Sequence, residues 1–215
     1  MNIGILGTGT VGQTIGSRLV ELGHNVRMGS RTAENATARA WSKAAGKSAS
    51  HGTFEDAAQF GEVLFNCTAG MGSLSALQFA KTVNLNHKVL IDVANPLDFS
   101  RGMPPSLTVC NTDSLGEQIQ RAHPLLNVVK ALNTMNCEIM VHPDRINGAH
   151  DVFICGNNMD AKKTVTLILM DWFGWNSVVD LGNITAARGM EMAIPLWLSL
   201  HKMLGTDTFN FKIMK

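Results

Sequence analysis

The residues with the clearest chemical role stand near the start of the chain, in the segment Gly7-Thr8-Gly9-Thr10-Val11-Gly12. This segment fits the pattern G-x-G-x-x-G, follows a short apolar run and precedes apolar residues at helical spacing. In that pattern Gly7 permits a tight turn, Gly9 lets backbone N–H groups approach a pyrophosphate, and Gly12 lets a helix pack closely on a strand. The phosphates would lie at the positive N-terminal end of the helix. The spacing therefore predicts a dinucleotide-binding turn.

A second feature indicates which dinucleotide is bound. The apolar run at 25–28 ends in Gly29-Ser30-Arg31, and the first acidic residue after it is Glu34. Sites for NAD place Asp or Glu at this point to bind the ribose 2′-hydroxyl, whereas an arginine suits a 2′-phosphate. We therefore expect NADP(H), with Ser30 donating a hydrogen bond to the phosphate and Arg31 pairing with it. The alternative is that Arg31 is a solvated charge at the start of the next helix.

The elements that must position these residues alternate along the chain. Apolar strands are predicted at 2–6, 25–28, 47–50, 62–67, 88–92 and 127–132, with helix-like segments between them. This alternation is typical of a parallel sheet with helices on both faces. We therefore expect an α/β fold of the Rossmann type, a doubly wound parallel sheet, over an NADP-binding domain of residues 1–135.

Residues 136–215 are predicted to form a small C-terminal α/β lobe that packs on this domain. The pattern indicates a strand at 151–156, a helix at 160–173, a short strand at 176–181, a long helix at 185–204 and an edge strand at 208–214. The long helix is apolar nearly all round and contains Pro195, which should kink it. Such a helix must be buried in its own subunit or against another. We therefore expect a homodimer that buries Trp197 and its neighbours.

Polar loops follow the later strands of the first domain. The glycine-rich loop Thr68–Ser73 follows one strand, Asn95 follows the next, and Asn133 follows the strand that contains Lys130. Ligands of doubly wound sheets bind outside the carboxyl ends of the strands, so the first loop should cover the ribose and nicotinamide. The alternative is a plain turn capped by Ser73. Lys130 and Asn133 are candidates for a pair that polarises a carbonyl or imine, and the alternative is a strand-end charge beside a turn former.

Composition excludes several classes of protein. The chain has 18 basic and 17 acidic residues without a basic run, so no nucleic-acid partner is expected. It has neither a leader pattern nor a long apolar span, so we expect a cytoplasmic protein without a membrane segment. The four cysteines form no ligand pattern with histidines, so no metal site is expected. Tyrosine is absent, which excludes the Tyr-x-x-x-Lys short-chain dehydrogenases.

Four segments together resemble those of a known family. They are Gly-Thr-Gly-Thr-Val-Gly at 7–12, Gly-Ser-Arg at 29–31, Val-Val-Lys-Ala-Leu-Asn-Thr at 128–134 and Ala-Arg-Gly-Met-Glu-Met-Ala-Ile-Pro-Leu at 187–196. The chain resembles the NADPH-dependent reductases of the deazaflavin coenzyme F420 over residues 2–212. It is also similar to the cytosolic reductase domain of the six-transmembrane metalloreductases.

The resemblance implies hydride transfer between NADP(H) and a deazaflavin or flavin-like ring, bound together in one cleft. Such a reaction depends on alignment of two rings more than on an acid or base. By resemblance, the adenine-side phosphates would be held by Thr8, Gly9, Thr10, Val11, Ser30 and Arg31. The nicotinamide would be surrounded by Thr68, Ala69, Ala94, Asn95 and the turn from Ala131 through Asn133 to Thr134.

This chain departs from its relatives where the second substrate is expected. It has Asn35 where some relatives have a lysine that assists the 2′-phosphate, and Leu132-Asn133-Thr134 where relatives can have Leu-His-Thr. The loop at 68–72 also lacks a proline found in them. Two alternative functions therefore stand beside the first: an NADPH-dependent reductase of a small carbonyl or imine, and a non-catalytic NADP(H)-binding redox sensor that meets a partner through the long helix.

Overall fold

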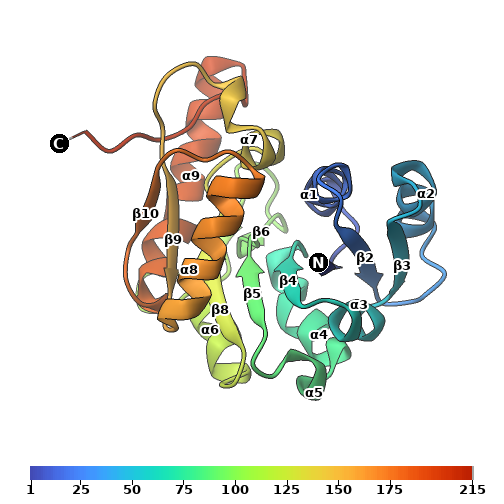
Figure 1. Ribbon diagram of the computed structural model, residues 1–215. Coiled ribbons are helices and arrows are strands. Elements are labelled where there is room, and N and C mark those ends of the chain that lie inside the picture. The colour runs from blue at the N-terminus through green and yellow to red at the C-terminus, as the bar shows by residue number, and fades with distance from the viewer. Residues whose placement is uncertain (215) are drawn as a thin grey trace.

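One eight-stranded sheet forms the centre of the computed structural model, which describes residues 1–214 (Figure 1). The strands lie in the order β10-β9-β8-β5-β4-β1-β2-β3, and neighbouring strands are parallel except β8 and β9. Their bounds are β1 Asn2–Leu6, β2 Asn25–Ser30, β3 Ala49–Thr53, β4 Val63–Asn66, β5 Val89–Asp92, β8 Asn127–Ala131, β9 Val152–Gly156 and β10 Val178–Asp180.

The strand order confirms the predicted doubly wound fold. The chain lays down β1, β2 and β3 outward in one direction and then crosses to β4 on the other side of β1. The order β3-β2-β1-β4-β5-β8 is that of the dinucleotide-binding Rossmann sheet, whose ligand lies at the point where the order reverses. That point is the gap between the carboxyl ends of β1 and β4.

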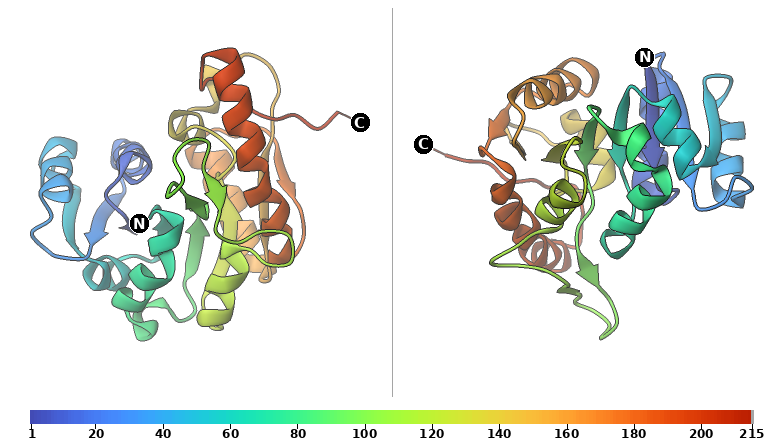
Figure 2. Two further views of the ribbon diagram at one scale, coloured as in Figure 1. Left: turned by 180° about the vertical axis from the view of Figure 1, so that it is seen from behind. Right: turned by 90° about the horizontal axis from the view of Figure 1, so that it is seen from below.

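Helices cover both faces of the sheet. Helices α1 (Thr10–Glu21), α2 (Ala36–Ala45), α7 (Cys137–Val141) and α8 (Met159–Leu167) pack on one face, where strand residues such as Ile5 and Phe65 point. The other face, which includes Leu64 and Leu90, is covered by α3 (Phe54–Phe60), α4 (Gly70–Ala80), α6 (Leu115–Ala122) and α9 (Ala187–Leu204), with the short α5 (Thr82–Leu85) at its edge. The view from behind in Figure 2 shows α9 in front of the sheet, on the face opposite α8.

Helix starts follow their capping residues. Residues 53–56, Thr-Phe-Glu-Asp, have the sequence pattern of a capping box and form one at the start of α3: Thr53 Oγ1 accepts from Asp56 N at 3.1 Å, and Asp56 Oδ2 accepts from Thr53 N at 2.8 Å. Helix α2 is capped by Asn35 rather than by Thr32, since Asn35 Oδ1 accepts from Ala38 N at 2.9 Å and asparagine is the stronger N-cap.

The C-terminal part continues the same sheet. β9 pairs with β8 and β10 pairs with β9, so the predicted boundary near residue 135, which stays a prediction, lies where the sheet changes from parallel to antiparallel. The predicted edge strand at 208–214 is wrong, since this segment forms no strand. It is held instead by Asp151, whose N–H donates to Phe211 O at 2.9 Å and whose Oδ2 accepts from Ile213 N at 2.6 Å.

Helix α9 is apolar on two sides but buried on only one. Met190 and Ile194 are buried in the core, whereas Met192, Leu196 and Met203 are exposed. Trp197 stacks on Phe209 of its own chain, with ring centroids 5.3 Å apart. The subunit therefore leaves an apolar face of α9 uncovered. Over residues 1–214 no helix combines the length and apolarity that a membrane crossing requires.

Candidate functional site

Two adjoining cavities lie at the carboxyl ends of the strands, where the sequence predicts the cofactor. The first, of about 810 Å³, is lined by predicted adenine-side residues, namely Gly7, Thr8, Gly9, Ser30 and Arg31. The second, of about 590 Å³, is lined by the predicted nicotinamide-side residues Ala94, Asn95 and Asn133, and also by Val11, which the resemblance assigns to the adenine-side phosphates. Cys67, Thr68 and Ala69 border both cavities. The loop after β4 is therefore the common wall of a two-part site.

The glycine loop has the geometry of a phosphate-binding turn. Gly7 has φ +120°, and a Cβ atom there would lie 2.5 Å from the Cys67 carbonyl oxygen. A Cβ at Gly12 would lie 2.6 Å from Gly7 O, so close packing of α1 on β1 requires glycine there. Among residues 1–214, no atom lies within 4 Å of a Cβ placed at Gly9, and no side chain caps the N-terminus of α1. The open space and free N–H groups at this helix end fit a pyrophosphate.

The exit of β2 presents the predicted 2′-phosphate residues. Arg31 is exposed at the first cavity and forms no ion pair with any residue in the described part of the chain. Ser30 is buried, and its hydroxyl donates to Thr32 O at 2.5 Å. Asn35 lines the same cavity while it caps α2. A free guanidinium at this place is available for an anionic ligand, whereas the Ser30 hydroxyl is already engaged.

A buried network that the sequence reasoning missed supports the loop after β4. Asn66 Nδ2 donates to Asp92 Oδ1 at 2.8 Å and to Ser73 Oγ at 3.0 Å. Asn66 Oδ1 accepts from Thr68 Oγ1 at 2.7 Å. Asn66 stands at the end of a predicted strand, but nothing in the local sequence indicated that Asp92 of the next strand would face it. These bonds hold the common wall of the two cavities in place.

Lys130 lies beneath the site rather than in it. Its side chain is fully buried and borders neither cavity. Its Nζ is 2.9 Å from Asp92 Oδ2 and 2.8 Å from Glu191 Oε1, and it also donates to Ala94 O. Burial by itself lowers the pKa of Lys130, but the two carboxylates more than offset this and raise it. The ammonium is therefore held charged as an ion-pair partner between β5, β8 and α9.

Asn133 does reach the second cavity. Its Nδ2 donates to Asn95 Oδ1 at 2.9 Å and to Met190 O of α9 at 3.0 Å. Asn95 Nδ2 donates in turn to Asn133 O at 2.9 Å. Of the other predicted residues, Ala131 is buried in β8, while Thr10 and Gly12 belong to α1 without bordering either cavity. The exits of β5 and β8 are thus joined by two interlocked amides.

Known proteins resemble this chain in sequence and in structure. The model of a family described as NADP oxidoreductase coenzyme F420-dependent matches residues 2–96. The crystal structure of an F420-dependent NADP-reductase candidate from Arthrobacter sp. FB24 is 47% identical, covers 99% of both chains and superposes with a TM-score of 0.93. This chain belongs to the coenzyme F420-dependent NADP oxidoreductase family.

Two further relatives share part of their length with this family member. Metalloreductase STEAP3 from Rattus norvegicus is 32% identical over 197 residues, which are 91% of this chain and 36% of that protein. The F420-dependent NADP reductase of Methanocaldococcus jannaschii is 28% identical over 148 residues, 68% of this chain and 65% of that protein. The predicted membership of this family is thereby confirmed, and with it the prediction that the protein is an NADP-dependent oxidoreductase.

The second cavity of this NADP oxidoreductase family member is poor in proton donors. Among the described residues that line it, only Cys67 and Asp98 have ionisable side chains. Burial raises the pKa of the Cys67 thiol, and hydrogen bonds from the Ser100 N–H and hydroxyl lower the pKa of Asp98. The remaining wall is largely apolar and includes Met71, Phe99, Met135 and Met140. At neutral pH the cavity therefore offers apolar surface and amide groups rather than a general acid.

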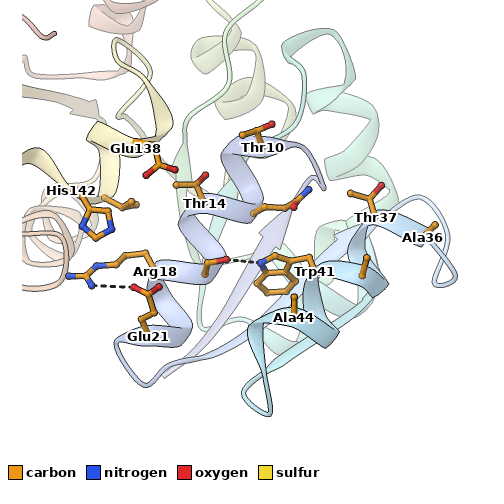
Figure 3. A pocket seen from close by; sticks show the side chains of 14 residues that line it. Thr10, Thr14, Arg18, Glu21, Ala36, Thr37, Trp41, Ala44, Glu138 and His142 are labelled. Carbon is orange, nitrogen blue, oxygen red and sulfur yellow. Dashed lines mark hydrogen bonds and ion pairs between the residues drawn. The ribbon is translucent and has the colours of Figure 1, made fainter. Parts of the chain in front are cut away.

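A third cavity, of about 890 Å³, lies between α1, α2 and α7 (Figure 3). Its walls carry polar and small side chains, including Thr14, Thr37 and His142. The Trp41 indole N–H donates to Ser17 Oγ at 3.0 Å, and Arg18 pairs with Glu21. Apart from Thr10 at the start of α1, this groove shares no residue with the predicted site. It runs along helices rather than across the strand ends, and we assign no function to it.

Proposed function

We propose that this protein transfers a hydride between NADP(H) and a deazaflavin or flavin-like ring. In the reducing direction, a hydride leaves the nicotinamide of NADPH for the acceptor ring, and the reduced ring takes up a proton from water. The protein would hold two rings against each other, and the cofactors would carry the chemistry. The observation that carries the proposal is the apolar second cavity, which adjoins the glycine loop and lacks a proton donor suited to neutral pH.

In this proposal each part of the site has one task. The N-terminus of α1 and the loop around Gly9 hold the pyrophosphate, and Arg31 pairs with the 2′-phosphate. Thr68, Ala69, Ala94, Asn95 and Asn133 surround the nicotinamide. The open space at Gly9 and the unpaired state of Arg31 within residues 1–214 support these assignments. A metal has no part in the proposed reaction.

Reduction of a small carbonyl or imine is the weaker candidate, because it needs an acid beside the nicotinamide. Lys130 was the residue predicted for that task, and it is enclosed by Asp92 and Glu191 outside the cavity. A redox sensor without catalysis would need the second cavity to be filled. Its volume of about 590 Å³ favours a site that admits a second ring.

The test is NADPH oxidation, followed by the loss of its absorbance, with purified protein and one acceptor at a time. A deazaflavin, FMN, FAD and buffer alone are the four arms. We expect turnover with the deazaflavin and none with buffer. Turnover with FMN or FAD instead would identify a flavin acceptor. Tight NADPH binding without turnover on any ring would refute hydride transfer to such rings.

We also propose a homodimer in which a second copy covers the exposed face of α9. Met192, Leu196 and Met203 lie on one side of the helix, since the first two are about one turn apart and the last two about two turns apart, and all three are exposed. Interfaces of permanent dimers are more apolar than ordinary surface. The proposed partners are therefore a small redox substrate and a second copy of this chain.

We place the protein in the cytoplasm in this proposal. The four cysteines are all free thiols, and two of them, Cys67 and Cys155, are buried. Free thiols of this kind suit a reducing compartment. Fractionation of the host cell with an antibody against this chain tests the location. Recovery in a secreted or membrane fraction would contradict it.

A further inference from the structure

Asn133 carries a hydrogen-bond acceptor that the protein leaves without a partner. The residue is 2% exposed and borders the second cavity. Within residues 1–214 its Oδ1 is buried and receives no hydrogen bond. A buried amide oxygen without a donor costs free energy, and buried polar groups of native proteins are nearly always paired. Because Asn133 borders the second cavity, a ligand bound there is a source of the missing donor.

The orientation of the Asn133 amide is set by backbone groups, which have only one possible role. Met190 O is a carbonyl and can only accept, so the Asn133 atom 3.0 Å from it must be the nitrogen. The same logic applies to Asn95, whose Nδ2 donates to Asn133 O at 2.9 Å. Asn95 Oδ1 must then face the second N–H of Asn133, at 2.9 Å. Both Asn133 donors are used, and Oδ1 is the group that remains.

The backbone supports this arrangement at some cost. Leu132, immediately before Asn133, is buried and has φ +63°, in the left-handed region that a leucine rarely adopts. Such conformations persist where the surroundings determine them strongly, and they concentrate at functional sites. The two bonds of Asn133 Nδ2 hold the residue that follows Leu132 in place at the end of β8.

We propose that Asn133 Oδ1 accepts a hydrogen bond from the carboxamide N–H of the nicotinamide and so sets the rotation of the ring. This assignment rests on the proposed function. Asn133 shares its cavity with Val11, in the first turn of the helix that would hold the pyrophosphate, and with Thr68 and Ala69, which border both cavities. These neighbours favour the nicotinamide over the second ring as the source of the N–H. Asn133 is then a positioning residue for hydride transfer.

The experiment compares two cofactors by binding alone. The 3-acetylpyridine analogue of NADP⁺ carries a methyl ketone, which keeps the carbonyl oxygen and lacks the N–H donor. Titrations give Kd for NADP⁺ and for the analogue with the wild-type chain, Asn133→Ala and Asn127→Ala. The wild type should bind NADP⁺ about tenfold more tightly than the analogue, because one hydrogen bond is lost. Asn133→Ala should bind both about equally.

Asn127→Ala is the matched control. It removes an amide at the opposite end of β8, where Asn127 borders neither of the two cavities, so the roughly tenfold preference should persist. Adenosine 2′,5′-bisphosphate, which lacks the nicotinamide, reports whether each variant keeps a folded adenine side. If Asn133→Ala fails to bind this bisphosphate, the variant is not folded. The test then rests on the affinities of the wild-type chain for NADP⁺ and for the analogue, which need no variant.

Each result has a distinct meaning. Equal affinity of the wild type for both cofactors, or a preference that survives in Asn133→Ala, would overturn the assignment alone. A third result would also overturn the assignment: equal affinity of the wild type for the two cofactors, together with a deazaflavin affinity that falls in Asn133→Ala. It would mean that Asn133 Oδ1 accepts its hydrogen bond from the second ring and not from the nicotinamide. Failure of the wild type to bind NADP⁺ would overturn the proposed function and this assignment with it.

Discussion

At the scale of single residues, the site separates positions required for folding from positions free for a ligand. Gly7 and Gly12 are constrained by protein atoms within 2.6 Å of the Cβ that any other residue would add, whereas Gly9 has open space and φ −73°. Arg31 is exposed without an ion pair in the described chain, and Lys130 is buried between two carboxylates. Residues of similar type in the sequence thus have opposite roles.

Substitution of Gly9 by alanine should weaken NADPH binding without loss of stability. The φ of this residue suits alanine, so the free energy of unfolding should stay the same or rise by roughly 0.4–1 kcal/mol. The added methyl group would occupy the space proposed for the pyrophosphate. NADPH titration and thermal melting measure the two effects. Gly12→Ala is the contrast, because its Cβ would strike Gly7 O and lower stability directly. Unchanged NADPH affinity in Gly9→Ala would place the phosphates elsewhere.

Substitution of Arg31 by alanine should weaken NADPH and leave NADH almost unchanged. A hydrogen bond to a charged group contributes about 1.5–3 kcal/mol, which corresponds to roughly ten- to hundredfold in Kd. Arg39→Ala is the matched control, since Arg39 is also exposed but does not border the cavity. The ratio of the two Kd values is the measurement. An equal loss for both cofactors would show that Arg31 does not read the 2′-phosphate.

At the scale of elements, α9 ties the C-terminal part to the site. Glu191 Oε2 and Oε1 accept from Leu115 N and Gly116 N of α6, at 2.9 Å and 3.0 Å. The same carboxylate pairs with Lys130, and the neighbouring Met190 O holds Asn133. One turn of α9 therefore fixes the start of α6, the end of β8 and the wall of the second cavity. Sites built on rigid elements in this way hold ligands more accurately than loops do.

Substitution of Lys130 by methionine should mainly lower stability. The change leaves Asp92 and Glu191 buried without their cation, and breaking a buried pair costs about 3–5 kcal/mol. Urea unfolding measures this loss. Lys163→Met on α8 is the control, because its exposed pair with Asp160 contributes at most about 1 kcal/mol. Folded Lys130→Met protein that binds NADPH normally but has lost turnover would restore Lys130 as a catalytic residue.

The segment after α9 should be released by acid through Asp151. Burial raises the pKa of this carboxyl, but hydrogen bonds from Ile213 N, Ser177 and Lys212 lower it to about 2, from 3.8. A depressed pKa gives stability that is present above about pH 4 and lost as the pH falls towards 2. Asp151→Asn should therefore lower the free energy of unfolding by roughly 2 kcal/mol at neutral pH and by almost nothing near pH 2. A difference in unfolding free energy that does not vary with pH would contradict this assignment.

At the scale of the whole molecule, the uncovered face of α9 bears on assembly. Leu196→Glu places a charge on the proposed dimer face and should convert the dimer to monomers, as measured by light scattering at micromolar concentration. Leu167→Glu on α8 is the control, since Leu167 is 59% exposed and Leu196 is 55% exposed, on opposite sides of the sheet. A wild-type monomer, or equal dissociation in both variants, would exclude α9 as the interface.

The sequence by itself determined the features that depend on neighbours along the chain. The glycine turn, the capping box at Thr53 and the alternation of apolar strands and helices are local, and together they specified the doubly wound fold and the predicted cofactor. Gly7, Gly12 and the exit at Arg31 lie where the pattern predicts.

Only the tertiary structure decided which distant polar groups meet. Lys130 is 38 residues from Asp92 in the chain, and Asn133 is 57 residues from Met190. No periodicity links such partners, so the sequence leaves Lys130 as either a candidate catalyst or a strand-end charge and does not predict its buried ion pairs. The segment at 208–214 alternates like a strand, but the groups of Asp151 bind it as an irregular segment. Pairing of charges and amides across the core depends on how the elements pack, and that is set by the whole fold.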